Sequence, residues 1–486
     1  MNSLLEQLLA YSKDNYYPMH MPGHKRNTTL LKNINPYEID ITEIDGFDNL
    51  HHAEGIIKDL IERVQSLYHS RKSYLLINGS TVGILAGISA CVKKKDRILM
   101  ARNCHKAVYN AVILNELNPV YLYPQMDGIY GIHGGISPKK IEEMLITYPD
   151  TKLVVLTSPT YEGIISDVKE IVRICHARRV PVLVDEAHGA HLGFHKDFPG
   201  GSIEAGADIV IHSIHKTLPA FTQTAVMHVN GDMIHEREVE KYLGIYETSS
   251  PSYVLMAGID QCMTLLSEQA NELFEAYKNH LDQFYEDMRG LKHLRVMRAS
   301  DYLPDQKEEH QIYEIDPSKI LISVKNTTIT GSELSQRLLD EYKIQLEMSS
   351  LSYGLAMTSI CDTKEGFERL KHALYEIDDS LKAKQESIMS LDIKLKQAMI
   401  PYEALQMENE VIRLTSAAGR VAANHIMVYP PGIPIVAAGE VINEQVITSL
   451  MEANKAGLEV LGLVEEQDEG KKQVHELGIT VIKMQE

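Results

Sequence analysis

Short apolar runs alternate with longer amphipathic segments through the first half of the chain. The runs predict strands at residues 73–77, 97–101, 152–157, 181–184 and 208–213. Apolar residues at helical spacing predict helices at residues 56–68, 82–92 and 164–178. Strands that alternate with helices form βαβ units and a mainly parallel sheet. In such a sheet, ligands bind at the carboxyl ends of the strands.

The pattern changes after residue 229, where a polar turn leads into a long helix expected at residues 254–291. Further on, we expect strands at 320–324 and 479–482 and helices at 330–342, 363–381 and 445–456. The Lys- and Ser-rich segment 381–398 is expected to be a connecting surface helix. We therefore divide the chain into an N-terminal arm (1–55), a ligand-binding large domain (56–290) and an α+β region (291–486), with a further boundary near 385–400.

The strand at 208–213 ends in polar residues that include Lys216. Removing an ammonium group from water is costly, so a lysine at the end of a buried strand has a lowered pKa. Its neutral amine can attack an aldehyde, and a Schiff base with pyridoxal phosphate would use this property. A single lysine after a strand is more often solvated. The interpretation of Lys216 therefore depends on what the other strand ends carry.

The end of the first strand has the residues of a phosphate cradle. Gly79 lets the backbone come close to a ligand, and the hydroxyls of Ser80 and Thr81 stand before a helix whose N-terminus attracts anions. The alternative is ordinary N-capping by Ser80 or Thr81.

Three other strand ends carry polar residues that suit the same cofactor. Asp185 could pair with a protonated pyridine nitrogen, or cap a helix. His105 could stack its ring on a planar cofactor, although a histidine at such a crossing is more often structural. His188 follows Asp185 by three residues and could reach a phenolic oxygen, and Thr160 follows a further strand. Together with Gly79 and Lys216, these residues predict one site at one edge of the sheet.

Composition narrows the choice of partners. The chain has 486 residues, 44% of them hydrophobic and 24% charged, as in soluble globular proteins. A formal charge of −19 argues against nucleic acid and anionic membranes as partners. The sequence shows no apolar run of about 18 residues and no secretory signal near its start. The five cysteines are scattered without a metal-binding pattern, so we expect free thiols, no metal and a cytoplasmic protein.

The arm carries a group of acidic residues, Asp40, Glu43, Asp45 and Asp48. Such a group is most often a solvated loop with helix caps. It could also place carboxylates near a cationic substrate.

Motifs spread over most of the chain resemble those of the ornithine/lysine/arginine decarboxylases, in the order that this family has them. They are Pro22-Gly-His-Lys25, Asn78-Gly-Ser-Thr81, Arg102-Asn-Cys-His-Lys106, Pro159-Thr-Tyr-Glu-Gly163, Val184-Asp-Glu-Ala-His-Gly-Ala-His191, Ser213-Ile-His-Lys-Thr-Leu218 and Tyr429-Pro-Pro-Gly-Ile-Pro434. The resemblance is to the short form without the N-terminal wing domain.

The resemblance implies a fold-type-I, aspartate aminotransferase-like large domain with a mainly parallel seven-stranded sheet and a smaller α+β C-terminal domain. It implies a homodimer or dimer-based oligomer that uses pyridoxal phosphate to decarboxylate a basic amino acid, with arginine slightly favoured over lysine and then ornithine. The alternatives are another fold-type-I enzyme, such as an aminotransferase, and a non-catalytic paralogue that binds the cofactor.

The resemblance also implies roles for individual residues. Lys216 would form the Schiff base, Asp185 would hold the pyridine nitrogen and His105 would stack on the ring. The phosphate would be held by Gly79, Ser80, Thr81, Ser213 and His215, and the phenolic oxygen would lie near Thr160 and His188. The phosphate of a partner subunit would be reached by Thr248, Ser249 or Ser250. Substrate candidates are Glu43, Asp45, Asp48 and Glu347 for a distal cation, and Arg420 for a carboxylate.

Overall fold

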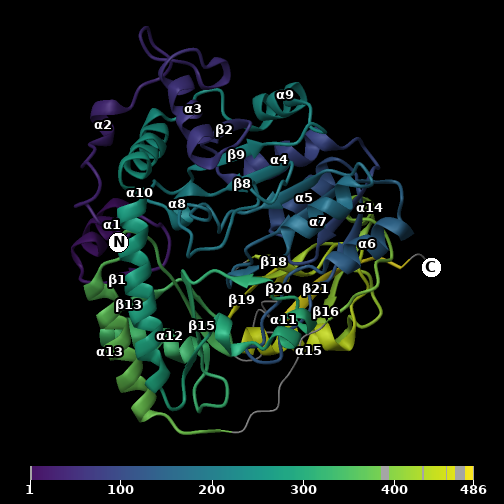
Figure 1. The fold of residues 1–486 in the computed structure, drawn as a ribbon. Coiled ribbons are helices and arrows are strands. Elements are labelled where there is room, and N and C mark those ends of the chain that lie inside the picture. The colour runs from purple at the N-terminus through teal and green to yellow at the C-terminus, as the bar shows by residue number, and fades with distance from the viewer. Residues whose placement is uncertain (1–2, 385–392, 430–431, 456, 466–476, 485–486) are drawn as a thin grey trace.

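A seven-stranded sheet forms the centre of the structure (Figure 1). The computed structural model describes residues 3–384, 393–429, 432–455, 457–465 and 477–484. The strands lie in the order β2 (Lys72–Leu76), β9 (Ala225–Val229), β8 (Ile209–His212), β7 (Val182–Asp185), β5 (Thr151–Thr157), β3 (Arg97–Ala101) and β4 (Asn118–Leu122). All neighbours are parallel except at β9, which is antiparallel to both β2 and β8. The expected mainly parallel, seven-stranded sheet is confirmed.

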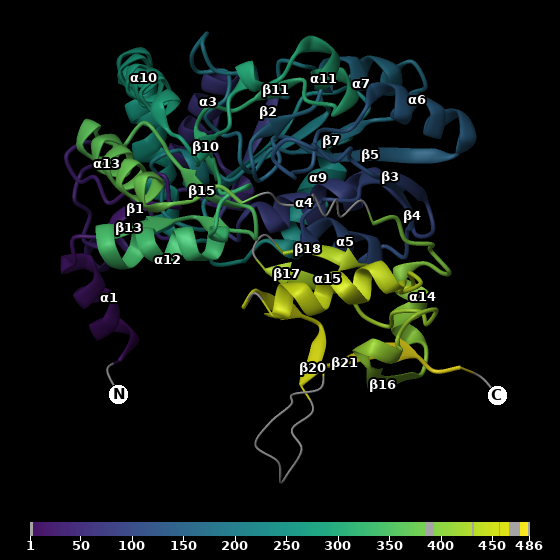
Figure 2. The same cartoon turned by 90° about the horizontal axis from the view of Figure 1, so that it is seen from below.

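Helices bury both faces of this sheet. One face packs on α4 (Ser80–Cys91), α5 (Lys106–Leu114) and α9 (Glu236–Tyr246) (Figure 2). The other face packs on α6 (Pro138–Thr147) and α7 (Val168–His176) and, at the β2 end, on α3 (Ile56–Tyr68) and α10 (Tyr253–Asp287) (Figure 2). Successive residues of β2 point to opposite faces of the sheet. Leu76 packs in the core that includes α4, and Leu75 packs in the core that includes α3 and α10. Every residue of β7 and β8 is buried, which explains their continuous apolar sequences.

The long helix α10 connects the large sheet to a second sheet. In Figure 1 it runs along one side of the molecule. The second sheet is antiparallel, with the order β10 (Arg295–Val296), β12 (Lys319–Ser323), β15 (Tyr353–Met357) and β14 (Met348–Ser349). It packs with α12 (Gly331–Tyr342) and α13 (Lys364–Ser380), and on one face its residues Ile320, Ile322 and Ala356 belong to the same core as those of α3 and α10. Short elements beside it are α11 (Pro304–Glu309) and β11 (Glu314–Ile315).

The N-terminal arm joins these two parts. After α1 (Leu4–Lys13), its strand β1 (Tyr17–Met19) pairs in parallel with β13 (Ile344–Leu346). The arm then crosses the one-turn helix α8 (Ile214–Thr217), where the Gly23 N–H donates to the His215 carbonyl at 2.7 Å. It continues through α2 (Pro36–Ile39) and a 3₁₀ turn (Leu50–His52) before α3. The arm is thus part of the wall around the end of β8.

The last part of the chain packs beneath α5 (Figure 2). It contains α14 (Pro401–Gln406), α15 (Glu444–Lys455) and two three-stranded sheets. Their orders are β16 (Asn409–Arg413), β21 (Leu477–Ile482), β20 (Leu463–Glu465), and β18 (Ile433–Val436), β17 (Ile426–Tyr429), β19 (Glu459–Leu461). The buried guanidinium of Arg102 fastens this part to the end of β3 by an ion pair with Glu440 at 2.8 Å. The division of the chain into domains given above stays a prediction.

Two predicted elements differ from the structure. The helix expected at 164–178 begins later, because Ile164–Ile165 form strand β6 with β11, and Asp167 caps the helix at Val168. The connecting helix expected at 381–398 is wrong at both described ends, since residues 381–384 and 393–398 are not helical. Residues 385–392, the prolines 430 and 431 of the predicted turn, and the last predicted residue of helix 445–456 lie outside the described residues. Among the helices that are described, none is both long and apolar enough to cross a bilayer.

Candidate active site

Lys216 lies on α8, directly after β8, at the carboxyl edge of the large sheet. The residue is half-buried by its exposed area, but its amine faces the protein, with Nζ 3.0 Å from Nε2 of His188. Burial lowers the pKa of Lys216, while the charges of Asp185 and Glu347 oppose that shift. The amine is therefore more nucleophilic at neutral pH than an ordinary lysine.

Asp185 ends β7, the strand next to β8, and its backbone pairs with Ile211. Its side chain is buried and accepts one hydrogen bond, from the Ala187 N–H at 3.2 Å. Burial raises the pKa of Asp185, and the nearby charge of Lys216 lowers it. A buried carboxylate with a single hydrogen bond can still bind a cation, so Asp185 suits a protonated ring nitrogen.

His188 is the neighbour of Lys216 from the loop after β7. Burial, followed by the charges of Lys216 and Lys319, holds the pKa of His188 well below its usual value, so the ring is neutral. The Tyr161 ring lies against it, with the centroids 4.6 Å apart. Thr160 is buried in the tight turn beside Tyr161, where its Oγ1 accepts from the Ile164 N–H at 3.2 Å.

His105 is the N-cap of α5, at the end of β3. Its Nδ1 accepts from the Ala107 N–H at 3.2 Å, which requires an unprotonated nitrogen. Burial lowers the pKa of His105 to about 4, and the charges of Lys216 and Lys106 add to this. His105 thus has a structural role as the cap of α5, in line with the alternative that this histidine is structural. A neutral flat ring near Lys216 is also what stacking on a cofactor needs.

The predicted phosphate cradle is the turn that leads from β2 into α4. Gly79 caps α4 with a φ of 80°, a left-handed value that favours glycine, and no side chain caps the helix. No side-chain acceptor therefore occupies the N-terminus of α4, and Thr81 beside it is exposed. The hydroxyl of Ser80 lies 2.9 Å from that of Ser213, which brings the two strand ends together.

His215 lies beside Lys216 on α8. Its Nδ1 donates to the Thr224 carbonyl at 2.9 Å. Burial lowers the pKa of His215 to about 4. The ring is therefore neutral at pH 7, like those of His105 and His188.

Of the substrate candidates, Glu347 lies nearest the amine cluster. Its carboxylate accepts from the Met21 N–H at 2.8 Å and from the hydroxyl of Tyr161, and its charge acts on the pKa of Lys216. The sheet edge thus faces a carboxylate that is held between the arm and the turn after β5.

The other substrate candidates have different surroundings. Asp48 accepts backbone N–H groups at the start of α3, including that of Gly55 at 2.7 Å, which fits the alternative of a capped loop. Partial burial opposes these donors, but they lower the pKa of Asp48. Glu43 is half-buried and Asp45 is exposed. Arg420 is far along the chain and pairs with Glu410 at 2.6 Å in the C-terminal part.

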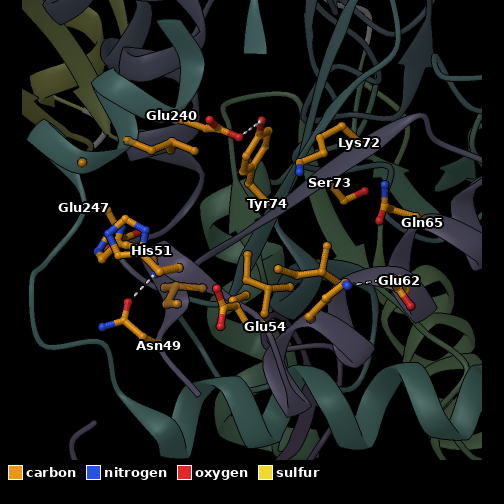
Figure 3. A pocket seen from close by; sticks show the side chains of 18 of the residues that line it. Asn49, His51, Glu54, Glu62, Gln65, Lys72, Ser73, Tyr74, Glu240 and Glu247 are labelled. Carbon is orange, nitrogen blue, oxygen red and sulfur yellow. Dashed lines mark hydrogen bonds and ion pairs between the residues drawn. The ribbon is translucent and has the colours of Figure 1, made fainter. Parts of the chain in front are cut away.

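The residues proposed for a partner's phosphate lie in the loop between α9 and α10. Thr248 is half-buried and its carbonyl accepts from His51 at 2.9 Å, whereas Ser249 and Ser250 are exposed. Ser249 borders a cavity of about 800 Å³ between the segment 49–54, α3, β2 and α9. Figure 3 shows four carboxylates around this cavity, Glu54, Glu62, Glu240 and Glu247. The cavity lies on the β2 side of the sheet, apart from Lys216.

Comparison with known proteins decides the family. A model of the Orn/Lys/Arg decarboxylase major domain matches residues 2–364, and a model of the C-terminal domain of the same family matches residues 381–481. The chain belongs to the Orn/Lys/Arg decarboxylase family. The family predicted from the motifs is confirmed, and with it the class of enzyme, a decarboxylase of basic amino acids that depends on pyridoxal phosphate.

Individual relatives of this decarboxylase support the same assignment. The arginine decarboxylase of Halalkalibacterium halodurans is 33% identical over 469 residues, which cover 94% of each chain. The inducible lysine decarboxylase of Escherichia coli is 22% identical and covers 91% of this chain and 75% of its own. The structure of the constitutive lysine decarboxylase of E. coli superposes with a TM-score of 0.76, at 20% identity, over 99% of this chain and 81% of that one. This last likeness concerns the fold, and it confirms the predicted fold class.

The site of this family member fits pyridoxal phosphate. Lys216 offers an amine with a lowered pKa, Asp185 a buried carboxylate with one hydrogen bond, and α4 an N-terminus that no side chain caps. These are the partners needed by an aldehyde, a protonated ring nitrogen and a phosphate, respectively.

Two buried lysines of this decarboxylase have no role in the prediction from sequence. Lys25, inside the Pro22–Lys25 motif, donates to the carbonyls of Pro18, His20 and Met357 and thereby folds the arm. Lys319 is 1% exposed and its Nζ lies 3.4 Å from Nδ1 of His188. Nothing in the local pattern distinguishes Lys319, because a lysine at the first residue of a strand is ordinarily solvated.

Proposed function

We propose that this chain decarboxylates arginine and holds pyridoxal phosphate covalently on Lys216. The observation that carries the proposal is the buried cluster at the ends of β7 and β8, in which Lys216 Nζ lies 3.0 Å from His188 and shares its electrostatic environment with Asp185. Membership of the decarboxylase family supports the reaction. The 33% identity to an arginine decarboxylase supports the choice of arginine over lysine.

The cofactor, when bound, would supply an aldehyde for amines and a protonated ring that withdraws electrons from the bond being broken. The chain's own groups would hold it. We assign Asp185 to the ring nitrogen, His105 to the ring face and the start of α4, with Ser80, Thr81 and Ser213, to the phosphate. His215 borders that group, and His188 and Thr160 are assigned to the phenolic oxygen.

Proton transfer is assigned to the residues nearest the amine. Loss of carbon dioxide leaves a substrate carbon that must gain a proton, and Nζ of Lys216 or the ring of His215 would return it. Burial lowers the pKa of Lys216, so its ammonium releases a proton more readily than that of an ordinary lysine, whereas His215, with a pKa of about 4, is neutral at pH 7 and is the weaker donor.

The distal guanidinium of arginine is assigned to Glu347. Oε2 of Glu347 already accepts from the Met21 N–H, and Oε1 accepts from the Tyr161 hydroxyl. Each of these two oxygens has a second lone pair that can accept from the substrate. A guanidinium can bond both oxygens of a carboxylate at once, whereas a lysine ammonium binds as a point charge. Glu43, Asp45 and Asp48 remain weaker candidates, and Arg420 has no assigned part.

A second copy of the chain would complete the site. We propose a homodimer in which Thr248, Ser249 or Ser250 reaches the phosphate held by the partner. The exposure of Ser249 and Ser250 in the single chain supports this.

The test measures product and cofactor together. Purified protein loaded with pyridoxal phosphate is supplied with arginine, lysine and ornithine in parallel, and released carbon dioxide and amine are quantified. We expect carbon dioxide and amine in equal amounts, fastest from arginine. Lys216→Ala should lose both turnover and the visible absorbance of the Schiff base, while Lys325→Ala, which removes a lysine that donates to the carbonyls of Gly128 and Ile129, should keep both.

Other outcomes would separate the alternatives. A keto acid without carbon dioxide would indicate an aminotransferase. Cofactor binding without turnover of any of the three amino acids would indicate a non-catalytic paralogue. Faster turnover of lysine than of arginine would overturn only the choice of substrate.

A further inference from the structure

Lys319 reaches the candidate active site from the second sheet. It begins β12, and its side chain passes over Gly163, where an added Cβ would lie 2.8 Å from Lys319 Cγ. Gly163 also has a left-handed φ of 95°, so both its conformation and its neighbour exclude a side chain. The stem of Lys319 is thereby fixed, and its amine ends 3.4 Å from Nδ1 of His188.

His188 therefore stands between two amines, with Lys216 3.0 Å from Nε2 and Lys319 3.4 Å from Nδ1. A neutral imidazole has one N–H and one lone pair, whereas an ammonium can only donate. Both amines therefore cannot be protonated and bonded to the ring at the same time. Either Lys319 is the ammonium and the Nε2–H of His188 faces a free amine on Lys216, or the reverse holds.

The charges around the two amines favour the first arrangement. Asp316, near Lys319, accepts from His191 at 3.1 Å and from the hydroxyl of Ser318 at 2.8 Å. Burial works against its ionisation, but His191 and the other donors outweigh it and lower the pKa of Asp316. Asp185, near Lys216, accepts a single hydrogen bond, and burial raises its pKa. The more firmly ionised carboxylate thus lies beside Lys319.

The remaining groups that face this row are Glu347, His105 and His215 around Lys216, and Glu347 and Lys25 around Lys319. The charge of Lys25 opposes a charge on Lys319, but Asp362 lies 4.0 Å from the amine of Lys25. Glu347 acts on both lysines, and the histidines are neutral. Burial lowers the pKa of Lys319 to about 8, against the attraction of Asp316, so it stays mostly protonated at pH 7.

We propose that Lys319 is a positioning residue that donates to Nδ1 of His188, fixes the Nε2–H tautomer of that ring, and so keeps Lys216 as the free amine. The same tautomer presents an N–H to whatever Nε2 faces, which would be the phenolic oxygen in the loaded enzyme. This inference rests on the proposed function, because it concerns the amine that captures the cofactor.

The first test follows cofactor capture by the full-length apoprotein. Capture joins Nζ of Lys216 to the aldehyde carbon and releases one water, so its rate follows the fraction of unprotonated amine. The rate is measured between pH 6 and pH 9 from the visible absorbance, with pyridoxal phosphate as the probe. In Lys319→Met, His188 is free to accept from a protonated Lys216. We expect the pH midpoint to rise by about one unit or more, which makes capture about tenfold slower at pH 7.

Lys325→Met is the matched control, because Lys325 follows β12 and, among the described residues, donates to the carbonyls of Gly128 and Ile129. Its midpoint should equal that of the unmodified chain. A purely structural role of Lys319 would change the melting temperature but not the midpoint. Identical midpoints in all three proteins would overturn the inference.

A second measurement needs no change to Lys319, in case Lys319→Met fails to fold. The ¹⁵N shifts of the His188 ring in the apoprotein, assigned by their loss in His188→Gln, distinguish the two tautomers. A protonated Nε2 supports the inference, and a protonated Nδ1 overturns it. If the unmodified chain captures no cofactor, or Lys216→Ala captures it equally well, the proposed function fails while the ring shifts still decide the tautomer.

Discussion

A buried lysine becomes reactive only when its surroundings leave its charge unsatisfied. Lys25 is buried too, but its three N–H groups meet three carbonyls, and Asp362 lies 4.0 Å away. Among the described residues Lys216 has one hydrogen-bond partner, a neutral histidine, and burial raises the pKa of its carboxylate neighbour Asp185. At this scale, the number of acceptors around each amine separates a structural lysine from a nucleophile.

Changing Glu347 to glutamine tests the assignment of the guanidinium site. The substitution keeps an acceptor for Met21 or Tyr161 but removes the charge. Because a hydrogen bond to a charged group contributes about 1.5–3 kcal/mol, we expect KM for arginine to rise roughly 10- to 100-fold, with a smaller change in kcat. The control is citrulline, the uncharged analogue of arginine, whose inhibition constant should stay the same. Equal weakening of both ligands would mean that Glu347 acts by holding the arm.

The sequence predicts those site residues that directly follow strands of the large sheet. Asp185, His105 and Lys216 each follow a strand of one parallel sheet, and parallel strand ends meet at one edge. Lys319 comes from a second sheet, and no local pattern shows that β12 faces the loop of His188. Similarly, the sequence gives no reason to prefer Glu347 to Asp48 as a ligand of the substrate. The structure separates them, because the Asp48 carboxylate accepts N–H groups at the start of α3. The expected helix at 381–398 rests on composition alone, without an apolar stripe to hold it on the protein.

At the scale of elements, the crossing of the arm over α8 depends on a glycine. A Cβ on Gly23 would lie 2.7 Å from the Leu218 carbonyl oxygen and 2.9 Å from the Thr217 carbonyl carbon, so the backbones can touch only without a side chain. Gly23→Ala should therefore push the arm away from α8. Overpacking of this kind costs about 1–3 kcal/mol, and we expect kcat/KM to fall roughly tenfold.

Limited proteolysis of Gly23→Ala should cut the arm faster, while the remainder of the chain stays resistant. Gly128→Ala is the control, because nothing lies within 4 Å of an added Cβ there. Cleavage and kcat/KM that match this control would show that the arm is not held by its contact with α8.

At the scale of the whole molecule, buried neutral histidines make stability depend on pH. Burial lowers the pKa of His105, His215 and His425 to about 4, against 6.5 in an unfolded chain. Above pH 6.5 both states are neutral at these rings and they have no effect. As the pH falls from 6.5 towards 4, only the unfolded chain gains protons, so the folded state loses stability, by up to about 1.4 kcal/mol per pH unit for each ring.

Urea midpoints measured at pH 7 and pH 5 check this expectation. His425 is the ring to change, since it lies outside the proposed catalytic cluster and accepts from the Ala438 N–H at 3.0 Å. His425→Gln should lower the difference between the two midpoints, and His235→Gln, at an exposed position, should leave it as it is. A difference that neither variant reduces would contradict the assignment to His425.

The proposed homodimer makes a prediction about which lesions complement each other. Two differently tagged copies are expressed together and only mixed dimers are purified. In one pair, Lys216→Ala is on one copy and the Thr248, Ser249 and Ser250 to alanine changes are on the other. If the loop serves the partner's phosphate, one of the two sites in each mixed dimer is intact, and about half of the wild-type activity should remain.

With all four changes on one copy and none on the other, both sites carry a lesion and activity should be lost. A site completed within one chain gives the opposite result in both pairs, because each lesion then harms only its own copy.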